Sequence, residues 1–210
     1  MFNEVMIVGG LFWSATYLLM IRRGFKDKTF GMPFAALCAN ISWEAIFAFV
    51  TPHSSPQIYI NYVWFSLDVV IVYHLLKYGK KEFPQFSSRT FYPVFVLGLG
   101  TALVMILAVG EELDDSIGMY AAFGQNLMMS VLFVTMLLGR NDLRGQSIYI
   151  ALFKLLGTGL SSTAFYLYRP GIQDSVLMQF LFVAIFVFDI IYFVMVYQKS
   201  KEQGIVWKRF

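Results

Sequence analysis

The chain has 210 residues, of which 58% are hydrophobic and only 14% are charged, and the apolar residues fall in long blocks. This composition excludes an ordinary soluble domain and indicates a membrane protein. The net charge of +3 does not indicate nucleic acid binding, because Lys and Arg flank the apolar blocks. Cys38 is the only cysteine, which excludes a disulfide within the chain and zinc sites built on cysteine pairs.

Seven apolar segments are each close to the roughly 20 residues that a membrane-spanning helix needs. No basic region precedes the first, which indicates a retained span rather than a cleaved signal peptide. The loops are short, and the chain has no linker, low-complexity tract or repeat. We therefore expect an all-α, polytopic membrane protein, with residues 1–210 forming one bundle of seven transmembrane helices. The predicted spans are 5–21, 31–50, 58–76, 91–109, 117–138, 148–168 and 176–197.

The positions of the basic residues predict the orientation of the bundle. Fourteen of the sixteen Lys and Arg residues follow the first, third and fifth spans or lie in the C-terminal tail, which includes Lys208 and Arg209. Cytoplasmic loops carry an excess of Lys and Arg. The sequence therefore predicts an integral, multi-pass membrane protein with its N-terminus outside and its C-terminus in the cytoplasm.

The second span carries an acidic residue, Glu44, that has no basic neighbour in the same segment. A carboxyl group inside a membrane costs at least a few kcal/mol to insert, so such residues are usually functional. Asn40 is four residues before Glu44 and shares its helical face, with Trp43 beside it. The last span carries a second such acid, Asp189, with Tyr192 on the same side.

Other polar residues in the spans allow more than one interpretation. Asp68, which shares a helical face with Trp64, is either functional, paired with Lys154 or part of a polar network. Lys154 either belongs to the site or extends toward the inner interface. Gln125 and Asn126 either contact a ligand or join helices through hydrogen bonds. The two histidines form no cluster with other potential ligands, so no metal site is predicted.

These residue types permit one kind of chemistry in particular. A carboxyl group that is withdrawn from water favours its protonated form and can act as a general acid. The aromatic faces of Trp43, Trp64 and Tyr192 can stabilise a cation without offering a nucleophile. Acid initiation within an aromatic cage is what carbocation chemistry on a lipid-soluble alkene requires. The pattern therefore permits a terpene cyclase but does not single one out.

Several motifs resemble the integral-membrane terpene cyclases of fungal meroterpenoid and indole-diterpene pathways. The first is FKDKTFGM at 25–32, which is followed by LCAN at 37–40 and by the Trp43-Glu44 pair. Further similar stretches are LLGR at 137–140, RG at 144–145, FKLLG at 153–157 and FDIIY at 188–192. The likeness extends from the first span to the last.

The resemblance implies a metal-independent cyclase without a cofactor, which protonates an epoxide or alkene of an isoprenoid or prenylated substrate drawn from the lipid bilayer. It assigns the two key acids to Glu44 and Asp189, one as the initiating acid and the other as terminating base or as the partner that tunes it. We expect both carboxyl groups to face one shared hollow. The expected substrate-binding residues are Asn40, Trp43, Trp64, Asp68, Gln125, Asn126, Lys154 and Tyr192.

Two other functions are compatible with the same buried acids. A small proton-coupled transporter or lipid-binding carrier would relay protons through them, although the chain has no repeat and no span interrupted in mid-membrane. An inert membrane scaffold would tolerate their substitution. Asp114-Asp115 lies in a loop and does not continue as the Asp-rich motif that binds a magnesium diphosphate.

Overall fold

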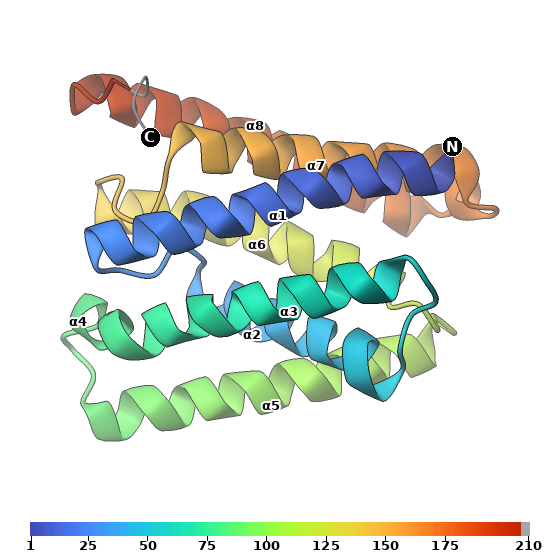
Figure 1. The fold of residues 1–210 in the computed structure, drawn as a ribbon, viewed down its shortest axis with the longest axis horizontal. Helices are drawn as coiled ribbons and strands as arrows, with labels where there is room; N and C mark the ends of the chain where they lie inside the picture. The colour runs from blue at the N-terminus through green and yellow to red at the C-terminus, as the bar shows by residue number, and fades with distance from the viewer. Residues whose placement is uncertain (207–210) are drawn as a thin grey trace.

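The computed structural model describes residues 1–206, and within that range it contains helices and no strand. Figure 1 shows the long helices lying side by side as one bundle. The α-helices of the described chain are α1 (Phe2–Asp27), α2 (Phe34–Ala45), α3 (Gln57–His74), the three-residue α4 (Lys80–Glu82), α5 (Ser88–Glu112), α6 (Met119–Arg140), α7 (Ile148–Tyr168) and α8 (Val176–Glu202). The π-helical turns η1 (Ile46–Val50) and η2 (Leu75–Gly79) continue α2 and α3, and the short 3-10 turn η3 (Ile172–Asp174) precedes α8.

Six helical segments within residues 1–206 are long and apolar enough to cross a membrane. They are α1, the continuous segment formed by α3, η2 and α4, and the helices α5, α6, α7 and α8. The segment Phe34–Val50, made of α2 and η1, is a shorter apolar helix. The prediction of an all-helical protein with several membrane-spanning helices is confirmed.

Helix α2 is the central helix of the bundle and packs against α3, α5 and α6 (Figure 1). Eight of its twelve residues are buried, including both Asn40 and Glu44. The prediction that this segment is helical from residue 31 is wrong by three residues, because Pro33 caps the helix in an extended conformation. Proline fits at this N-cap position, since the backbone amide there has no partner within the helix and proline has no amide hydrogen. The central position of α2 places its polar residues away from lipid.

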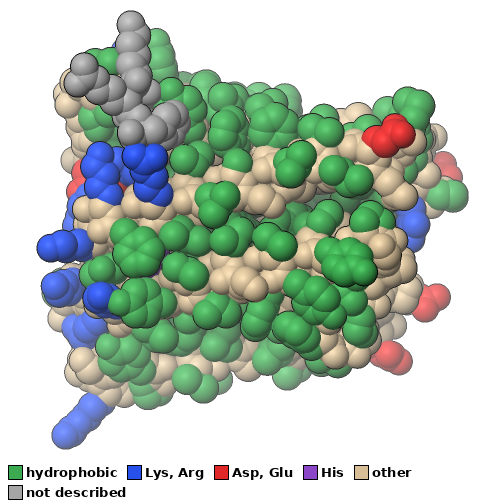
Figure 2. Space-filling model, viewed as in Figure 1, with side chains coloured by type: hydrophobic (Ala, Val, Ile, Leu, Met, Phe, Trp, Pro, Cys, Tyr) green, Lys and Arg blue, Asp and Glu red, His purple; other side chains and the backbone are tan. Residues whose placement is uncertain are grey.

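Charge is separated between the two ends of the bundle. Figure 2 shows Lys and Arg side chains gathered at the left end, where α1 and α8 end in the same view, and Asp and Glu side chains mostly at the right end. Lys208 and Arg209, which the sequence places in the basic tail, lie outside the described residues.

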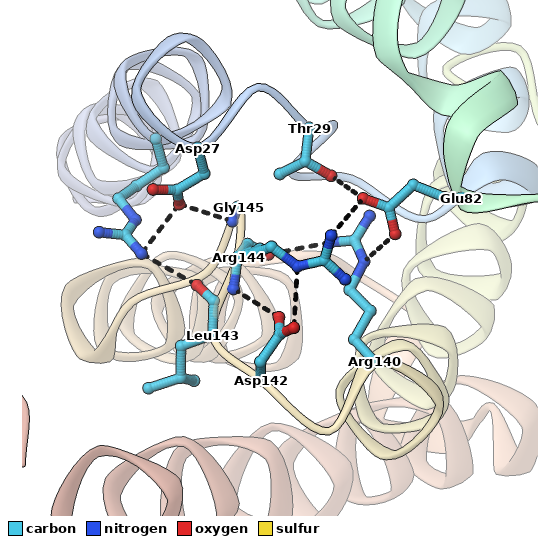
Figure 3. Close-up of polar contacts among 9 residues, drawn as sticks. Asp27, Thr29, Glu82, Arg140, Asp142, Leu143, Arg144 and Gly145 are labelled. Atoms are coloured by element: carbon cyan, nitrogen blue, oxygen red, sulfur yellow. Dashed lines mark hydrogen bonds and ion pairs between the residues drawn. The ribbon is translucent and has the colours of Figure 1, made fainter. Parts of the chain in front are cut away.

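A polar network at the basic end joins three segments that are distant in sequence (Figure 3). Asp27 accepts a hydrogen bond from the Gly145 amide at 2.9 Å and pairs with Arg23 at 2.9 Å. Glu82 accepts a hydrogen bond from Thr29 and pairs with Arg140 at 3.2 Å. The motifs at 25–32 and 137–145 that carry the family resemblance therefore meet here, where they hold the loops together.

Glu82→Gln is expected to destabilise the protein by about 3 kcal/mol, because it leaves the buried guanidinium of Arg140 without its counter-charge. The side chain of Arg140 is only 6% exposed. Thermal unfolding of the detergent-solubilised protein measures the effect. The matched control is Glu202→Gln, whose ion pair with Lys199 is on the surface with Glu202 63% exposed and should contribute less than about 1 kcal/mol. Equal melting temperatures for the two variants would contradict a structural role for the network.

Candidate active site

A cavity of about 490 Å³ lies among α1, α2, α3, α6 and α7, toward the end opposite the basic loops. Its mouth is formed by the loop that follows η1, by the loop that precedes α6 and by Arg169. Its walls carry many aromatic rings: Trp13, Tyr17, Trp43, Trp64, Phe123 and Phe165. The volume falls within the range of roughly 300–1,000 Å³ that is typical of small-molecule sites.

Glu44 lines this cavity and belongs to a four-residue polar cluster built by α1, α2 and α3. Tyr17 donates a hydrogen bond to Glu44 Oε1 at 2.9 Å. Asn40 Nδ2 lies 3.0 Å from the same oxygen and 2.8 Å from Asp68 Oδ2. Glu44 Oε2 and Asp68 Oδ1 have no hydrogen-bond partner in the described part of the chain. All four side chains are buried, so their hydrogen bonds are made within the protein and not with solvent.

Tyr17→Phe is expected to slow the reaction at this site about ten-fold, because it removes a hydrogen bond, worth roughly 1.5–3 kcal/mol with a charged partner, that holds Glu44 and stabilises its carboxylate form. The phenyl ring keeps the packing of Tyr17 against Trp13 and Trp64. The turnover number of the purified variant measures the effect. Tyr59→Phe is the control, since Tyr59 is 65% exposed. A turnover number equal to that of wild type would show that Tyr17 does not contribute to the reaction.

Two tryptophans of the cavity wall are held in place by hydrogen bonds. Trp43 Nε1 donates to the Gly118 carbonyl at 2.9 Å, and Trp64 Nε1 donates to Ser14 Oγ at 3.0 Å. Gly118 has a φ of +63°, and a Cβ atom there would lie 2.2 Å from the ring of Phe47. The loop before α6 can therefore approach Trp43 only because residue 118 is glycine. The aromatic wall is fixed before any ligand binds.

His53 closes one side of the mouth and is held as a neutral imidazole. Asn61 Nδ2 lies 3.0 Å from its Nδ1, which accepts that hydrogen bond, and its Nε2 then donates to the Ile117 carbonyl at 3.1 Å. Burial lowers the pKa of His53, and the hydrogen bond to the Ile117 carbonyl and the negative charge of Asp115 oppose this shift only in part. A neutral histidine favoured by the folded state contributes stability above the unfolded pKa of about 6.5, and this stability is lost as the pH falls below it.

We therefore expect wild type to lose more thermal stability than His53→Gln when the pH is lowered from about 7 to about 5, the interval in which an ordinary histidine becomes protonated. Glutamine has both a donor and an acceptor but does not titrate. Melting temperatures over this pH interval test the expectation. Parallel curves for the two proteins would show that His53 does not sense the pH.

We expected Asp189 and Glu44 to face one shared hollow, and the structure does not place them so. The side chain of Asp189 is buried but is absent from the wall of the cavity that Glu44 lines. Instead, Lys154 Nζ pairs with Asp189 Oδ1 at 2.5 Å. Lys154 is fully buried, so it neither extends to the interface nor pairs with Asp68. The partner of Asp189 comes from the neighbouring helix α7, which no pattern within the last span could reveal.

The other predicted site residues divide between the cavity and the region behind it. Asn40, Trp43, Trp64, Gln125 and Asn126 line the cavity. Asp68 lies behind Asn40, to which it is hydrogen-bonded. The Tyr192 ring lies against Phe133 with centroids 5.0 Å apart, away from the cavity wall.

Asn126 connects the cavity to the buried ion pair. Its Oδ1 accepts a hydrogen bond from Lys154 at 3.3 Å, and its Nδ2 donates to Thr158 at 3.2 Å. The Lys154 ammonium also lies 5.7 Å from the ring centroid of Trp13, which lines the cavity. Asp189 therefore affects the cavity wall through Lys154 rather than by contact.

Sequence reasoning missed Trp13 and Tyr17, which both line the cavity. They lie four residues apart on α1, so one helical face carries both rings. That spacing was a usable signal, but α1 has no charged residue in its apolar part to draw attention to it.

The fold and the site define the class of this protein as a multi-pass helical membrane protein with a buried carboxyl group in an aromatic cavity. The chain belongs to the Pyr4-like transmembrane terpene cyclases, whose family model matches residues 1–202. The family resemblance of the sequence motifs and the integral-membrane location are thereby confirmed.

Three curated relatives illustrate the family. The Pyr4-family terpene cyclase mfmH of Annulohypoxylon moriforme is 30% identical, with 78% of this chain aligned to 69% of that protein. The terpene cyclase macJ of Penicillium terrestre is 31% identical, with 76% aligned to 64%. The asnovolin H synthase nvfL of Aspergillus novofumigatus is 29% identical, with 74% aligned to 66%. The chain thus spans about two thirds of the length of each relative. No solved structure matches it.

Proposed function

We propose that this chain is a membrane-bound terpene cyclase that folds a prenylated substrate in the aromatic cavity and starts ring closure by proton transfer from Glu44. The observation that carries the proposal is the carboxyl group of Glu44, which is buried yet lies in the cavity wall beside Tyr17 and Asn40. The relatives, which are named as terpene cyclases, support this reaction type.

The proposed membrane topology has seven crossings. Helix α2 with η1 supplies the seventh, because it lies between the long helices and ends at the loop that forms the cavity mouth (Figure 1). The basic end of the bundle faces the cytoplasm under the positive-inside rule. The N-terminus and the cavity mouth then lie on the opposite side.

In the proposed reaction, Glu44 transfers its proton to the oxygen of a prenyl epoxide or to a carbon of an alkene. No ion pair joins Glu44 or Asp68 to Lys or Arg within the described chain, so a proton is the available counter-charge for this pair of carboxyl groups. After transfer, Tyr17 and Asn40 stabilise the carboxylate that is left. Asp68 holds Asn40 in position through their hydrogen bond.

Proton transfer leaves a carbocation, which the double bonds of the prenyl chain attack in turn to close the rings. The faces of Trp13, Trp43 and Trp64 line the cavity and stabilise the moving positive charge. Loss of a proton to the Glu44 carboxylate ends the cascade and restores the acid. The substrate and product are then isomers.

Asp189 has a different role from the one expected of a second acid. We assign it as a positioning residue, which fixes Lys154 and through it the side chain of Asn126 in the cavity wall. The ion pair also places a positive charge behind the wall, beside Trp13. Gln125, whose Oε1 has no hydrogen-bond partner among the described residues, is available to bind the polar part of the substrate.

The proposal is tested by incubating membranes that contain the protein with an aromatic compound bearing a farnesyl epoxide. The expected product has the mass of the substrate but fewer double bonds and more rings. In deuterated water, initiation at an alkene adds one carbon-bound deuterium, whereas initiation at an epoxide adds only exchangeable deuterium. Transport of the chemically unchanged compound across the membrane of proteoliposomes would instead indicate a transporter.

A further inference from the structure

A second hollow, of about 470 Å³, lies between α7 and α8. Figure 1 shows these two helices side by side along one edge of the bundle. Three residues of its wall are 38–64% exposed, so the hollow is a groove on the membrane-facing surface: Leu156, Val183 and Phe186. It shares no lining residue with the aromatic cavity.

A carboxyl residue that lines this groove has one oxygen without a hydrogen-bond partner in the described chain. Asp189 lines the groove, is 1% exposed and accepts a hydrogen bond from Lys154 at its Oδ1. Its Oδ2 forms no hydrogen bond with any described residue. Asp189 is the fourteenth of the 27 residues of α8, so it lies well inside the apolar part of this span. Bilayer hydrocarbon offers no hydrogen-bond donor at that depth, and an unpaired polar group there costs several kcal/mol.

We propose that this groove binds an apolar alcohol from the bilayer, whose hydroxyl group donates a hydrogen bond to Asp189 Oδ2. The walls match an apolar body, since they are formed mainly by Leu155, Leu156, Leu160, Phe182, Val183 and Phe186. The donor is a neutral hydroxyl group for electrostatic reasons. An anionic head group is repelled by Asp189, and an ammonium group is repelled by Lys154, which already neutralises the carboxylate.

Gly159 offers a way to block the groove without touching Asp189. A Cβ atom at Gly159 would meet no other atom within 4 Å, so a side chain fits there and fills the groove. Gly100 on α5 is equally open and is exposed on the surface outside the groove. Gly159→Leu and Gly100→Leu are therefore matched variants that differ in whether they obstruct the groove. Substitution of Asp189 itself is unsuitable because it unpairs Lys154.

The test uses purified protein in lipid nanodiscs and two photoreactive probes, a diazirine analogue of farnesol and its methyl ether. Labelled peptides are assigned by mass spectrometry. We expect the alcohol to label α8, which lines the groove but not the aromatic cavity, about ten-fold more strongly than the ether, as the loss of one hydrogen bond to a carboxylate implies. Gly159→Leu should abolish this labelling, and Gly100→Leu should leave it unchanged.

Equal labelling of α8 by the alcohol and the ether would overturn the proposal, as would labelling of α8 that persists in Gly159→Leu. Labelling of α1, α2, α3, α6 or α7 can arise in the aromatic cavity and is counted separately. The groove proposal can therefore fail while the proposed cyclase function holds, and the reverse outcome is equally distinguishable.

Discussion

Glu44→Gln is expected to lower kcat for cyclisation by at least about 100-fold, which is the low end of the effect of removing a general acid. Glutamine is nearly isosteric, and its carbonyl oxygen can still accept the hydrogen bonds from Tyr17 and Asn40. It cannot deliver the initiating proton. The variant should therefore fold normally and bind substrate, so that the loss appears in kcat and not in KM.

The measurement is product formation from a prenyl epoxide by purified enzyme in detergent, together with the melting temperature of each variant. Glu111→Gln is the matched control, because Glu111 is an exposed carboxyl group near the same end of the bundle. It should retain the activity of wild type. A Glu44→Gln enzyme that keeps more than half of its activity would show that the proton comes from another group.

The second large effect concerns the buried pair of Lys154 and Asp189. Asp189→Leu or Lys154→Met alone is expected to destabilise the protein by about 3–5 kcal/mol, because each leaves one buried charge without its partner. The double variant removes both charges and should recover most of this stability, since apolar replacements of a buried ion pair are often neutral. Lys154→Arg should retain the pair. Thermal unfolding of the four variants measures these differences.

Activity of the same variants separates a positioning role from a chemical one. If Asp189 acts only by fixing Lys154 and Asn126, Lys154→Arg keeps near wild-type activity, and the stable double variant, which lacks the hydrogen bond from Lys154 to Asn126, loses far less turnover than Glu44→Gln. The cavity wall still contains Glu44 in each case. A double variant that is as stable as wild type but as inactive as Glu44→Gln would show that Asp189 contributes chemically and that the two-acid mechanism is correct.

The sequence predicted the central element of the fold because burial in a membrane protein leaves a direct mark. Glu44 and Asn40 are polar residues in an apolar segment, and only a helix surrounded by others can carry them. The helix around them is accordingly the most enclosed of the bundle, whereas α5, which carries no charged residue in its apolar part, buries only Phe91, Phe95 and Ile106.

Contacts between helices could not be predicted in the same way. The face on which a residue lies follows from helical periodicity, but the partner helix does not. Asp189 therefore looked like an unpaired acid, although Lys154 of α7 neutralises it. The spacing of Trp13 and Tyr17 likewise indicates a shared helical face, but Tyr17 becomes part of the site only when α1 packs beside α2 and α3.

The motifs with the strongest family resemblance serve two different purposes in the structure. Trp43 and Glu44 face the cavity, whereas Asp27 and Arg140 belong to the network that joins loops at the basic end (Figure 3). A sequence motif does not show whether its residues serve the reaction or the fold. The spatial arrangement separates these two roles. The loops at the basic end hold together the helices that position Glu44.

The most direct test of the account is a structure of the protein with an unreactive analogue of a prenyl epoxide, in which an amine replaces the epoxide group. We expect the amine to lie within hydrogen-bond distance of the Glu44 carboxyl group, with the prenyl chain against Trp43 and Trp64 in the aromatic cavity. An amine bound at Asp189, with the chain outside that cavity, would contradict it.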